Sequence, residues 1–514
     1  MMRPYPTPTL LLASLVLAPA LSAQTADQHP SDVPNAYFKY TYILCPGTPG
    51  MSPPVSSRAY GYMGLAAYES IVDGVPGWTS LEGDLPELGT LPATNPDSVY
   101  HWPTCANYAL CCMADSLFYN GNVTVLGDLH MIRDGFDAQF AGEPADVLAR
   151  SRAFGTAIAN AVLDMARTDG AYRSQTTNFD PNYFIPAGPG FWQPAPGQNA
   201  LQAHWGNKRP FMEADTMNAL MTVVPPPVDS VPGSACYDAA LEVYQRSQTL
   251  TATDTLTARY WADDVKSPPT HYVQLTEQLM RREGKDLAFA ARGYAIMTMS
   301  VADAFVACWR WKYMHNWHRP RHYIPQYIDA NWMPIINTPP FPEFTSGHSS
   351  GSGAWGESMN EVFGTNFAFT DSTHGALFGG PRSYPSFDSA AAECANSRLL
   401  GGIHYTFSNI NGLENGALIA QNIVALFDGL ITAVEPTVVG APADIRYDAT
   451  NGMLIPGASV GTEHIRVVAV GSGIVVRNFR GGGPYALGRL PAGAYVAEVI
   501  GAERTIMRFV HTAQ

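Results

Sequence analysis

HYVQLTEQLMRREGKDLAFAARGYAIMTMSVADAFVACWRWKYMHNWHR, residues 271–319, carries its apolar side chains at helical spacing. Apolar residues three and four positions apart line one face of an α-helix, whereas a half-buried strand alternates. Convincing alternation is missing from residues 24–433, so we predict an all-α domain there. The same helical spacing recurs in SRAYGYMGLAAYESIV (57–72), TCANYALCCMADSLFY (104–119), ADVLARSRAFGTAIANAVLDMAR (145–167), CYDAALEVYQRSQTL (236–250) and NGLENGALIAQNIVALFDGL (411–430).

Two cations lie at the end of the longest stretch, in WKYMHNWHRP. Lys312 and Arg319 are seven residues apart, which is nearly two helical turns, so we expect both on one face of a helix that Pro320 ends. Arginine offers a planar fork for two oxygens, and lysine offers a point charge. The pair is typical of sites for phosphate-like anions.

A second segment, FTSGHSSGSGAW, supplies neutral donors for the same kind of anion. Ser346 and Gly347 are placed where a helix begins, and the free amides of a helix N-terminus favour an anion. Glycine also lets the backbone approach closely. His348 follows and titrates near neutrality, so it is a candidate acid–base group.

The third segment, SRLLGGIHY, holds Arg398 and His404. Six residues would put them on different faces of a continuous helix, but Gly401 and Gly402 permit a turn between them. Both side chains could then converge with those of the first two segments. Together the three segments predict a site for one tetrahedral oxyanion.

Composition limits the function classes. The chain has 514 residues, of which 46% are hydrophobic, enough for a sizeable core and more than one domain. Its formal charge of -14 argues against nucleic acid as a partner, because phosphate backbones require a basic surface. The cations of the three segments are therefore local exceptions in an acidic protein.

Residues 1–23 have the features of a secretory signal. They contain one arginine, an apolar run from Leu10 to Leu17 and small residues before residue 24. No later stretch has the roughly 18 consecutive apolar residues of a membrane span, so we expect no membrane span and a secreted or cell-surface location. Residues 24–55 are polar and rich in proline and glycine, and we expect an extended arm there.

The last 81 residues have a different composition and residue pattern. Residues 434–514 contain short β-branched runs separated by Gly, Pro, Asp and Asn, which predicts a small antiparallel β-sandwich. The seven cysteines are few for this length, and export would permit disulfides, which we expect in the N-terminal cluster. The odd number leaves at least one thiol unpaired.

Lys-x6-Arg-Pro, Ser-Gly-His and Ser-Arg-x5-His, in this order, resemble the signature of the vanadium-dependent haloperoxidases and the type 2 phosphatidic acid phosphatases. The resemblance covers about residues 34–430 and implies two four-helix bundles. It implies vanadate as the cofactor, with no haem and no nucleotide, and hydrogen peroxide, halide and a small organic acceptor as reactants. The vanadate oxygens would be held by Lys312, Arg319, Ser346, Gly347 and Arg398, the vanadium would be bound by His404, and His348 would move protons.

Further residues favour the haloperoxidase branch. The segment RYWADD resembles a helix that carries an aspartate partner for the anion-binding arginine, which would pair Asp264 with Arg398. Trp309 and Phe341 fall where chloroperoxidase-like members place aromatic rings beside the halide. One departure is Thr345, which stands where the family pattern has proline.

The C-terminal ending LPAGAYVAEVIGAERTIMRFV resembles the sorting domain of bacterial type IX secretion cargo. The resemblance implies a bacterial protein that the outer-membrane secretion machinery exports. An ordinary sandwich appended to an enzyme is the alternative.

Three other functions are compatible with parts of the sequence. A secreted acid phosphatase would use the same pocket without a metal, with His404 as nucleophile and His348 protonating the leaving group. A non-catalytic surface protein could keep the fold alone. Finally, Gly347–Gly351 fits the Gly-x-Ser-x-Gly elbow of serine hydrolases, but a proline-rich segment precedes it where that elbow needs a strand.

Overall fold

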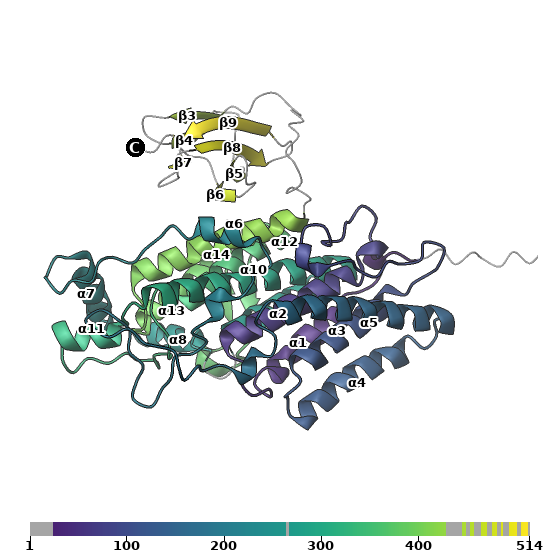
Figure 1. The fold of residues 1–514 in the computed structure, drawn as a ribbon, viewed down its shortest axis with the longest axis horizontal. Coiled ribbons are helices and arrows are strands. Elements are labelled where there is room, and N and C mark those ends of the chain that lie inside the picture. Colours follow the sequence, from purple (N-terminus) through teal and green to yellow (C-terminus); the bar gives the residue numbers. More distant parts are fainter. Residues whose placement is uncertain are drawn as a thin grey trace, which may run out of the picture.

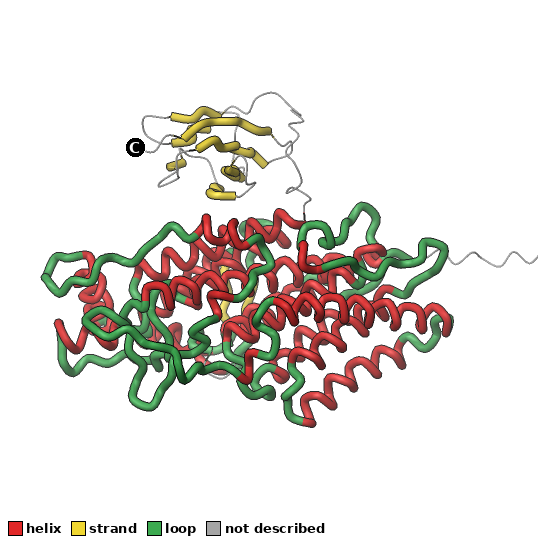
Figure 2. Tube along the Cα trace, viewed as in Figure 1, coloured by secondary structure: helices red, strands yellow, loops and turns green. Residues whose placement is uncertain are grey.

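The computed structural model describes residues 24–263 and 267–427, together with seven strands between residues 445 and 511. Residues 24–427 are mainly helical, which confirms the predicted all-α class (Figures 1 and 2). None of the described helices is long and apolar enough to cross a membrane. The α-helices are α1 (Asp32–Leu44), α2 (Pro53–Glu69), α3 (Trp102–Leu117), α4 (Val123–Gln139), α5 (Ala145–Thr168), α6 (Ala214–Leu220), α7 (Ala235–Gln248), α8 (Ala252–Tyr260), α9 (Pro268–Arg282), α10 (Leu287–His315), α11 (Pro320–Tyr327), α12 (Gly347–Phe363), α13 (Phe387–Leu400) and α14 (Thr406–Phe427).

Helix α10 is the centre of the helical region. It packs along α2 on one side and along α12 and α14 on another, while α3 packs against both α2 and α5 (Figure 1). Its 29 residues span about 44 Å at 1.5 Å per residue. Almost every residue from Leu287 to Lys312 is buried, because neighbours cover α10 on all sides. The cationic end of α10 is therefore inside the protein.

Glycines allow α12 and α14 to lie close together. A Cβ on Gly353 would come within 2.3 Å of the Leu413 carbonyl oxygen, and one on Gly416 within 2.1 Å of the Ser350 carbonyl oxygen. Any larger residue would force these two helices apart. The close packing brings the start of α12 beside the start of α14, where the Ser346 amide donates to the Ser408 carbonyl oxygen at 3.4 Å.

The prediction of an extended arm for residues 24–55 is wrong for much of that segment. Residues 32–44 form helix α1, whose buried side chains include Val33, Tyr37, Thr41 and Leu44. These positions follow the helical spacing of three and four. The proline- and glycine-rich character belongs to the segments on either side of α1.

The expected disulfides are also absent. None of the seven cysteines forms a disulfide bond, and six of them are buried. Cys105 and Cys111, in the N-terminal cluster, lie on helix α3 and fill positions in the hydrophobic core. The cysteines of this cluster thus act as small apolar residues.

A short β-hairpin lies between α12 and α13. Its strands are β1 (Phe369–Asp371) and β2 (Arg382–Tyr384), which pair in antiparallel fashion. Phe369 and Tyr384 are buried partners in this pairing, with ring centroids 5.4 Å apart. Strands of three residues are too short to show a pattern of alternation in the sequence.

The C-terminal segment forms the expected antiparallel strands. They make a three-stranded sheet in the order β3-β4-β7 and a four-stranded sheet in the order β6-β5-β8-β9. The boundary at residue 434 and the signal segment 1–23 lie outside the described residues and stay predictions. The strands are β3 (Ile445–Asp448), β4 (Met453–Pro456), β5 (His464–Ala469), β6 (Val475–Arg480), β7 (Tyr485–Ala486), β8 (Gly493–Ile500) and β9 (Thr505–His511).

Candidate active site

Lys312 and Arg319 do not share one helix, contrary to the expectation from their spacing. Helix α10 ends at His315 because Asn316 adopts a left-handed conformation, with φ 47° and ψ 35°. Pro320 begins helix α11 instead of ending α10, and Arg319 is the N-cap residue of α11. Proline suits the first position of a helix because its missing N–H is not needed there. Both cations are nevertheless buried at this junction.

The ammonium group of Lys312 is enclosed by the loop that precedes α12. Its Nζ donates to the carbonyl oxygens of Pro342 at 3.0 Å, Glu343 at 2.9 Å and Thr345. Burial lowers the pKa of Lys312 to about 8. The ammonium group is therefore largely charged at neutral pH, although it is removed from water.

Arg319 connects this loop to the segment that carries His404. Its Nε and Nη2 donate to the Phe341 carbonyl oxygen, each at 3.1 Å, and its Nη1 donates to the Ile403 carbonyl oxygen at 2.9 Å. The same Nη1 lies 2.9 Å from Nε2 of His404. Burial lowers the pKa of Arg319 to about 10, so the guanidinium also stays charged at neutral pH.

The Ser-Gly-His segment begins helix α12, as predicted. Ser346 is the N-cap residue, and its Oγ accepts from the Ser349 amide at 3.4 Å and from the Ser349 hydroxyl at 2.8 Å. The described residues before Ser346 form a loop, not a strand, which excludes the serine-hydrolase elbow.

Gly347 borders a space that no side chain of the described residues fills. Although the residue is buried, a Cβ placed on it would meet only the Trp309 ring, at 3.6 Å. This space lies at the N-terminus of a 17-residue helix, where backbone amides favour negative charge. The geometry suits close approach of an oxyanion.

Arg398 and His404 lie on either side of the predicted glycine turn. Helix α13 ends at Leu400, and Gly402 has a φ of +76°, a conformation that favours glycine. Arg398 is buried, and it donates from Nε to the Ser397 hydroxyl and from Nη2 to the Ala258 carbonyl oxygen, both at 2.9 Å. Its expected partner Asp264 lies outside the described residues.

The imidazole of His404 is held by a buried carboxylate that the sequence did not reveal. Nδ1 of His404 lies 2.7 Å from Oε1 of Glu343, which also accepts from the Tyr405 amide at 3.2 Å. Burial raises the pKa of Glu343 to about 7. A carboxylate on one imidazole nitrogen fixes the ring and leaves the other nitrogen as a ligand, an arrangement common at metal sites.

The electrostatics of His404 show that the three segments converge. Its pKa lies well below the usual value, first because of burial and then because of the charges of Arg319, Lys312, His348 and Arg398. His404 is therefore neutral at ordinary pH. Its Nε2 lone pair is directed toward Arg319, one of the predicted oxyanion holders.

His348 is buried beside the same charges. Burial and then Arg398 hold its pKa well below the usual value, and its Nε2 has no hydrogen-bond partner among the described residues. Oδ2 of Asp263 lies 3.9 Å from this nitrogen. Asp263 was not among the residues predicted from the sequence, because no local pattern in RYWADD indicates this contact, and the pairing of Asp264 with Arg398 stays a prediction.

The two predicted aromatic residues lie together beside the cations. The ring centroids of Trp309 and Phe341 are 4.8 Å apart, and both rings are buried. The Phe341 ring lies 5.1 Å from Nζ of Lys312 and 5.0 Å from the guanidinium carbon of Arg319. The aromatic pair therefore forms an apolar wall next to concentrated positive charge.

The charge balance of the site supports an anionic ligand. Lys312 and Arg319 form no ion pair with a carboxylate in the described part of the chain, and their bonds go to carbonyl oxygens and to His404. Glu343 is a carboxylate near both cations, but it supplies at most one negative charge for two buried positive charges, so an oxyanion would provide the remaining counter-charge. Two cations, a neutral imidazole nitrogen, a serine hydroxyl and a glycine amide at a helix start fit a tetrahedral oxyanion such as vanadate.

Comparisons with known proteins agree with this geometry. Residues 325–432 match the family model of the VCPO second helical-bundle domain. The chain is similar to the crystal structure of the first bacterial vanadium-dependent iodoperoxidase, with 29% identity and a TM-score of 0.69 over 77% of this chain and 96% of that chain. None of the curated proteins compared with the chain matches it.

Two further solved structures share the fold at lower identity. The holo-type bacterial vanadium-dependent chloroperoxidase has 14% identity and a TM-score of 0.57, over 79% of this chain and 96% of that chain. The apo-type has 13% identity and the same TM-score of 0.57, over 74% and 95%. This chain therefore has the fold of the bacterial vanadium haloperoxidases, and its residues 325–432 correspond to the second helical bundle of that family.

Proposed function

We propose that this protein is a vanadium-dependent haloperoxidase. In the reaction, hydrogen peroxide, a halide ion and a proton give hypohalous acid and water, and the hypohalous acid halogenates a small organic acceptor. The observation that carries the proposal is the neutral His404, whose Nδ1 is held by Glu343 while its Nε2 faces the charged Arg319. The bacterial vanadium-dependent iodoperoxidase of similar fold supports the oxidoreductase assignment.

The residues that would hold vanadate divide into charged and neutral donors. Lys312, Arg319 and Arg398 supply buried positive charge for the oxygens, and charge-assisted hydrogen bonds are about twice as strong as neutral ones. The Ser346 hydroxyl and the Gly347 amide lie at the start of α12 and would complete the set. When bound, vanadate supplies a Lewis acid that polarises peroxide for attack by halide.

His404 and His348 have different parts in this proposal. His404 presents a fixed neutral nitrogen and would bind vanadium through Nε2, because Glu343 holds Nδ1. Contrary to the expectation that His348 titrates near neutrality, burial and Arg398 hold its pKa well below the usual value. Its Nε2 has no hydrogen bond to described residues, and the negative charge of a bound oxyanion would raise this pKa, so that the nitrogen could exchange a proton with the reactants. Formation of hypohalous acid consumes one proton per turnover, and in this proposal His348 delivers it.

Trp309 and Phe341 would form the halide side of the site. Their paired rings lie beside Lys312 and exclude water from one side of the cation. A halide held near Lys312 would then have these rings on one side.

The deciding experiment compares two reactions in the same purified protein. The protein is supplied with vanadate, and peroxide-dependent oxidation of chloride, bromide and iodide is measured beside hydrolysis of a phosphate ester. We expect halide oxidation that is lost in His404→Ala and kept in the matched surface variant His130→Ala. If the protein hydrolyses the phosphate ester at a rate that does not depend on peroxide, and oxidises no halide, it is an acid phosphatase. A folded protein with neither activity would indicate a non-catalytic surface protein.

We also propose that the protein is exported from a bacterial cell. Residues 1–23 would act as the signal peptide, and residues 434–514 would engage the outer-membrane secretion machinery. The sequence features at both ends support this proposal. Removal of residues 434–514 should retain the protein inside the cell envelope, as judged by fractionation, and unchanged release into the medium would contradict it.

A further inference from the structure

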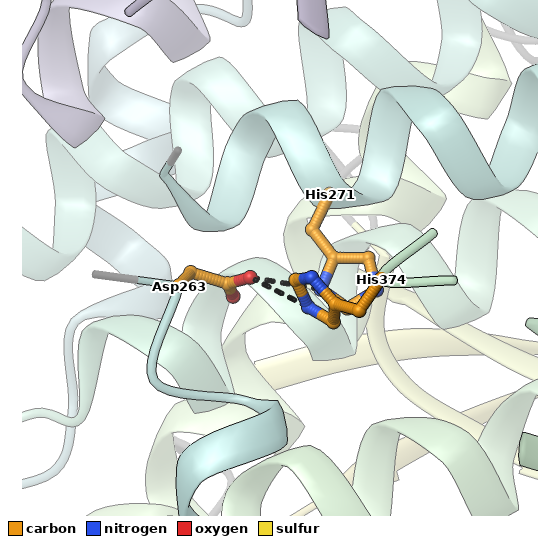
Figure 3. A group of neighbouring side chains, drawn as sticks. All are labelled: Asp263, His271 and His374. Carbon is orange, nitrogen blue, oxygen red and sulfur yellow. Dashed lines mark hydrogen bonds and ion pairs between the residues drawn. The ribbon is translucent and has the colours of Figure 1, made fainter. Parts of the chain in front are cut away.

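Asp263, His271 and His374 form a second cluster beside the oxyanion site. Asp263 follows helix α8, His271 lies in the first turn of α9, and His374 follows strand β1. Nδ1 of His271 lies 3.0 Å from Oδ1 of Asp263, and Nε2 of His374 lies 3.5 Å from the same oxygen. One ligand atom from each residue lies within 4.8 Å of the others, and Figure 3 shows both imidazoles directed toward the Asp263 carboxylate.

The cluster is buried and has unused ligand atoms. The side chains of Asp263, His271 and His374 are only 0%, 1% and 9% exposed. Oδ2 of Asp263 and Nε2 of His374 have no hydrogen-bond partner among the described residues. Buried polar atoms are normally paired, so these two atoms indicate a missing ligand.

His271 also has the supporting contact that metal-binding histidines usually have. Its Nε2 lies 2.9 Å from Oδ2 of Asp371, and Asp371 in turn accepts from the Tyr260 hydroxyl and from the Thr373 amide. Metal-bound histidines almost always donate their other ring N–H to a carboxylate, a carbonyl or water. The Asp371 contact fixes the imidazole with Nδ1 toward Asp263.

We propose that Asp263, His271 and His374 bind one divalent transition-metal ion, with Zn²⁺ as the best fit. The ligands are Nδ1 of His271, Nε2 of His374 and the Asp263 carboxylate. Zinc bonds to nitrogen and oxygen of about 2.0–2.2 Å place tetrahedral ligand atoms about 3.3–3.5 Å apart, close to the separations of 3.0 and 3.5 Å.

The ion would join three separate parts of the chain. It would tie the end of α8, the start of α9 and the loop after β1 into one rigid unit. This unit borders His348, because Oδ2 of Asp263 lies 3.9 Å from Nε2 of that residue. The proposal does not depend on vanadate or on peroxidase activity.

The test uses the full-length protein and Zn²⁺ alone, without vanadate. After metal removal with a chelator, we expect calorimetric titration to show one Zn²⁺ per chain and thermal unfolding to shift upward on binding. His374→Ala and Asp263→Asn should each weaken Zn²⁺ binding at least about tenfold. His204→Ala is the matched control, because His204 forms an exposed pair with Asp180 at 2.9 Å, and it should bind Zn²⁺ normally. His404→Ala should also keep Zn²⁺ binding, which separates this site from the oxyanion site.

The opposite results would overturn the proposal. Absence of stoichiometric Zn²⁺ binding would show that the cluster is a directly hydrogen-bonded histidine–carboxylate network. Binding that persists unchanged in His374→Ala would place the ion elsewhere. His374 lies in a partly exposed loop, so this variant decides the question even where Asp263→Asn fails to fold.

Discussion

Glu343 and His404, 61 residues apart, are joined by a buried contact of 2.7 Å between Oε1 and Nδ1. The contact links the loop before α12 to the segment before α14, and Arg319 lies 2.9 Å from the other nitrogen of the same imidazole. The orientation of the proposed vanadium ligand is thus set by two side chains from different segments.

Replacing Glu343 by Gln should weaken vanadate binding. The amide keeps a hydrogen-bond acceptor for Nδ1 but loses the negative charge that makes the imidazole a better ligand. Loss of such a supporting group typically reduces metal affinity about 10- to 100-fold. Calorimetric titration with vanadate measures the change. Glu283→Gln, a surface change at the end of α9, is the control, and equal affinities in the two variants would contradict the role of Glu343.

Oxyanions should stabilise the protein through Lys312. Phosphate or vanadate at about 100 times its Kd raises the free energy of unfolding by about 2.7 kcal/mol when it binds only the folded state. Lys312→Met should largely remove this increase, because the buried ammonium group contributes one of the charges that hold the anion. Thermal unfolding with and without anion gives the measurement. The exposed Lys39→Met serves as control, and an undiminished increase in Lys312→Met would show that the anion binds elsewhere.

Two glycines should respond differently to alanine. In Gly347→Ala the new Cβ meets only Trp309, at 3.6 Å, so stability should change by less than about 1 kcal/mol while vanadate binding weakens. In Gly416→Ala the Cβ would lie 2.1 Å from the Ser350 carbonyl oxygen, and forced separation of α12 and α14 should destabilise the fold by about 1–3 kcal/mol or more. Denaturant unfolding and vanadate titration of both variants check the contrast. Undiminished vanadate affinity in Gly347→Ala would mean that this space does not take the anion.

Glu69 should make stability depend on pH. Its carboxyl group is 1% exposed at the end of α2, Oε1 accepts from the Leu81 amide at 2.8 Å, and burial raises its pKa to about 7. Because the folded pKa exceeds the unfolded value, the favourable contribution is fully present below about pH 4.5 and is lost as the pH rises to about 7. The loss is on the order of 3 kcal/mol.

Glu69→Gln should remove that dependence. The variant should be more stable than the unmodified protein at pH 8, by about 2–3 kcal/mol, and similar to it at pH 4.5. Urea unfolding at the two pH values compares the proteins directly. A stability difference that does not change with pH would mean that Glu69 ionises normally in the folded protein.

Local patterns in the sequence determined the fold class, and they predicted the residues of the candidate oxyanion site. Helical spacing of apolar residues predicted the all-α region, because a helix repeats every 3.6 residues whatever surrounds it. Ser346 and Gly347 marked the start of α12, and Gly401 and Gly402 marked the turn before His404, since caps and turns depend on neighbouring backbone. The order of the three segments then gave the family resemblance.

The tertiary structure decided which side chains face one another. The end of α10 depends on Asn316 in a left-handed conformation, which charge spacing alone could not predict. The contact of Glu343 with His404 and the cluster around Asp263 join residues from separate elements, so they depend on how those elements pack. In particular, the close packing of α12 on α14 through Gly353 and Gly416 brings the two histidine-bearing segments together. Long-range contacts of this kind leave no periodic signal in the sequence. Any buried acid that the fold brings close to the imidazole could hold it, so the sequence does not show which acid does.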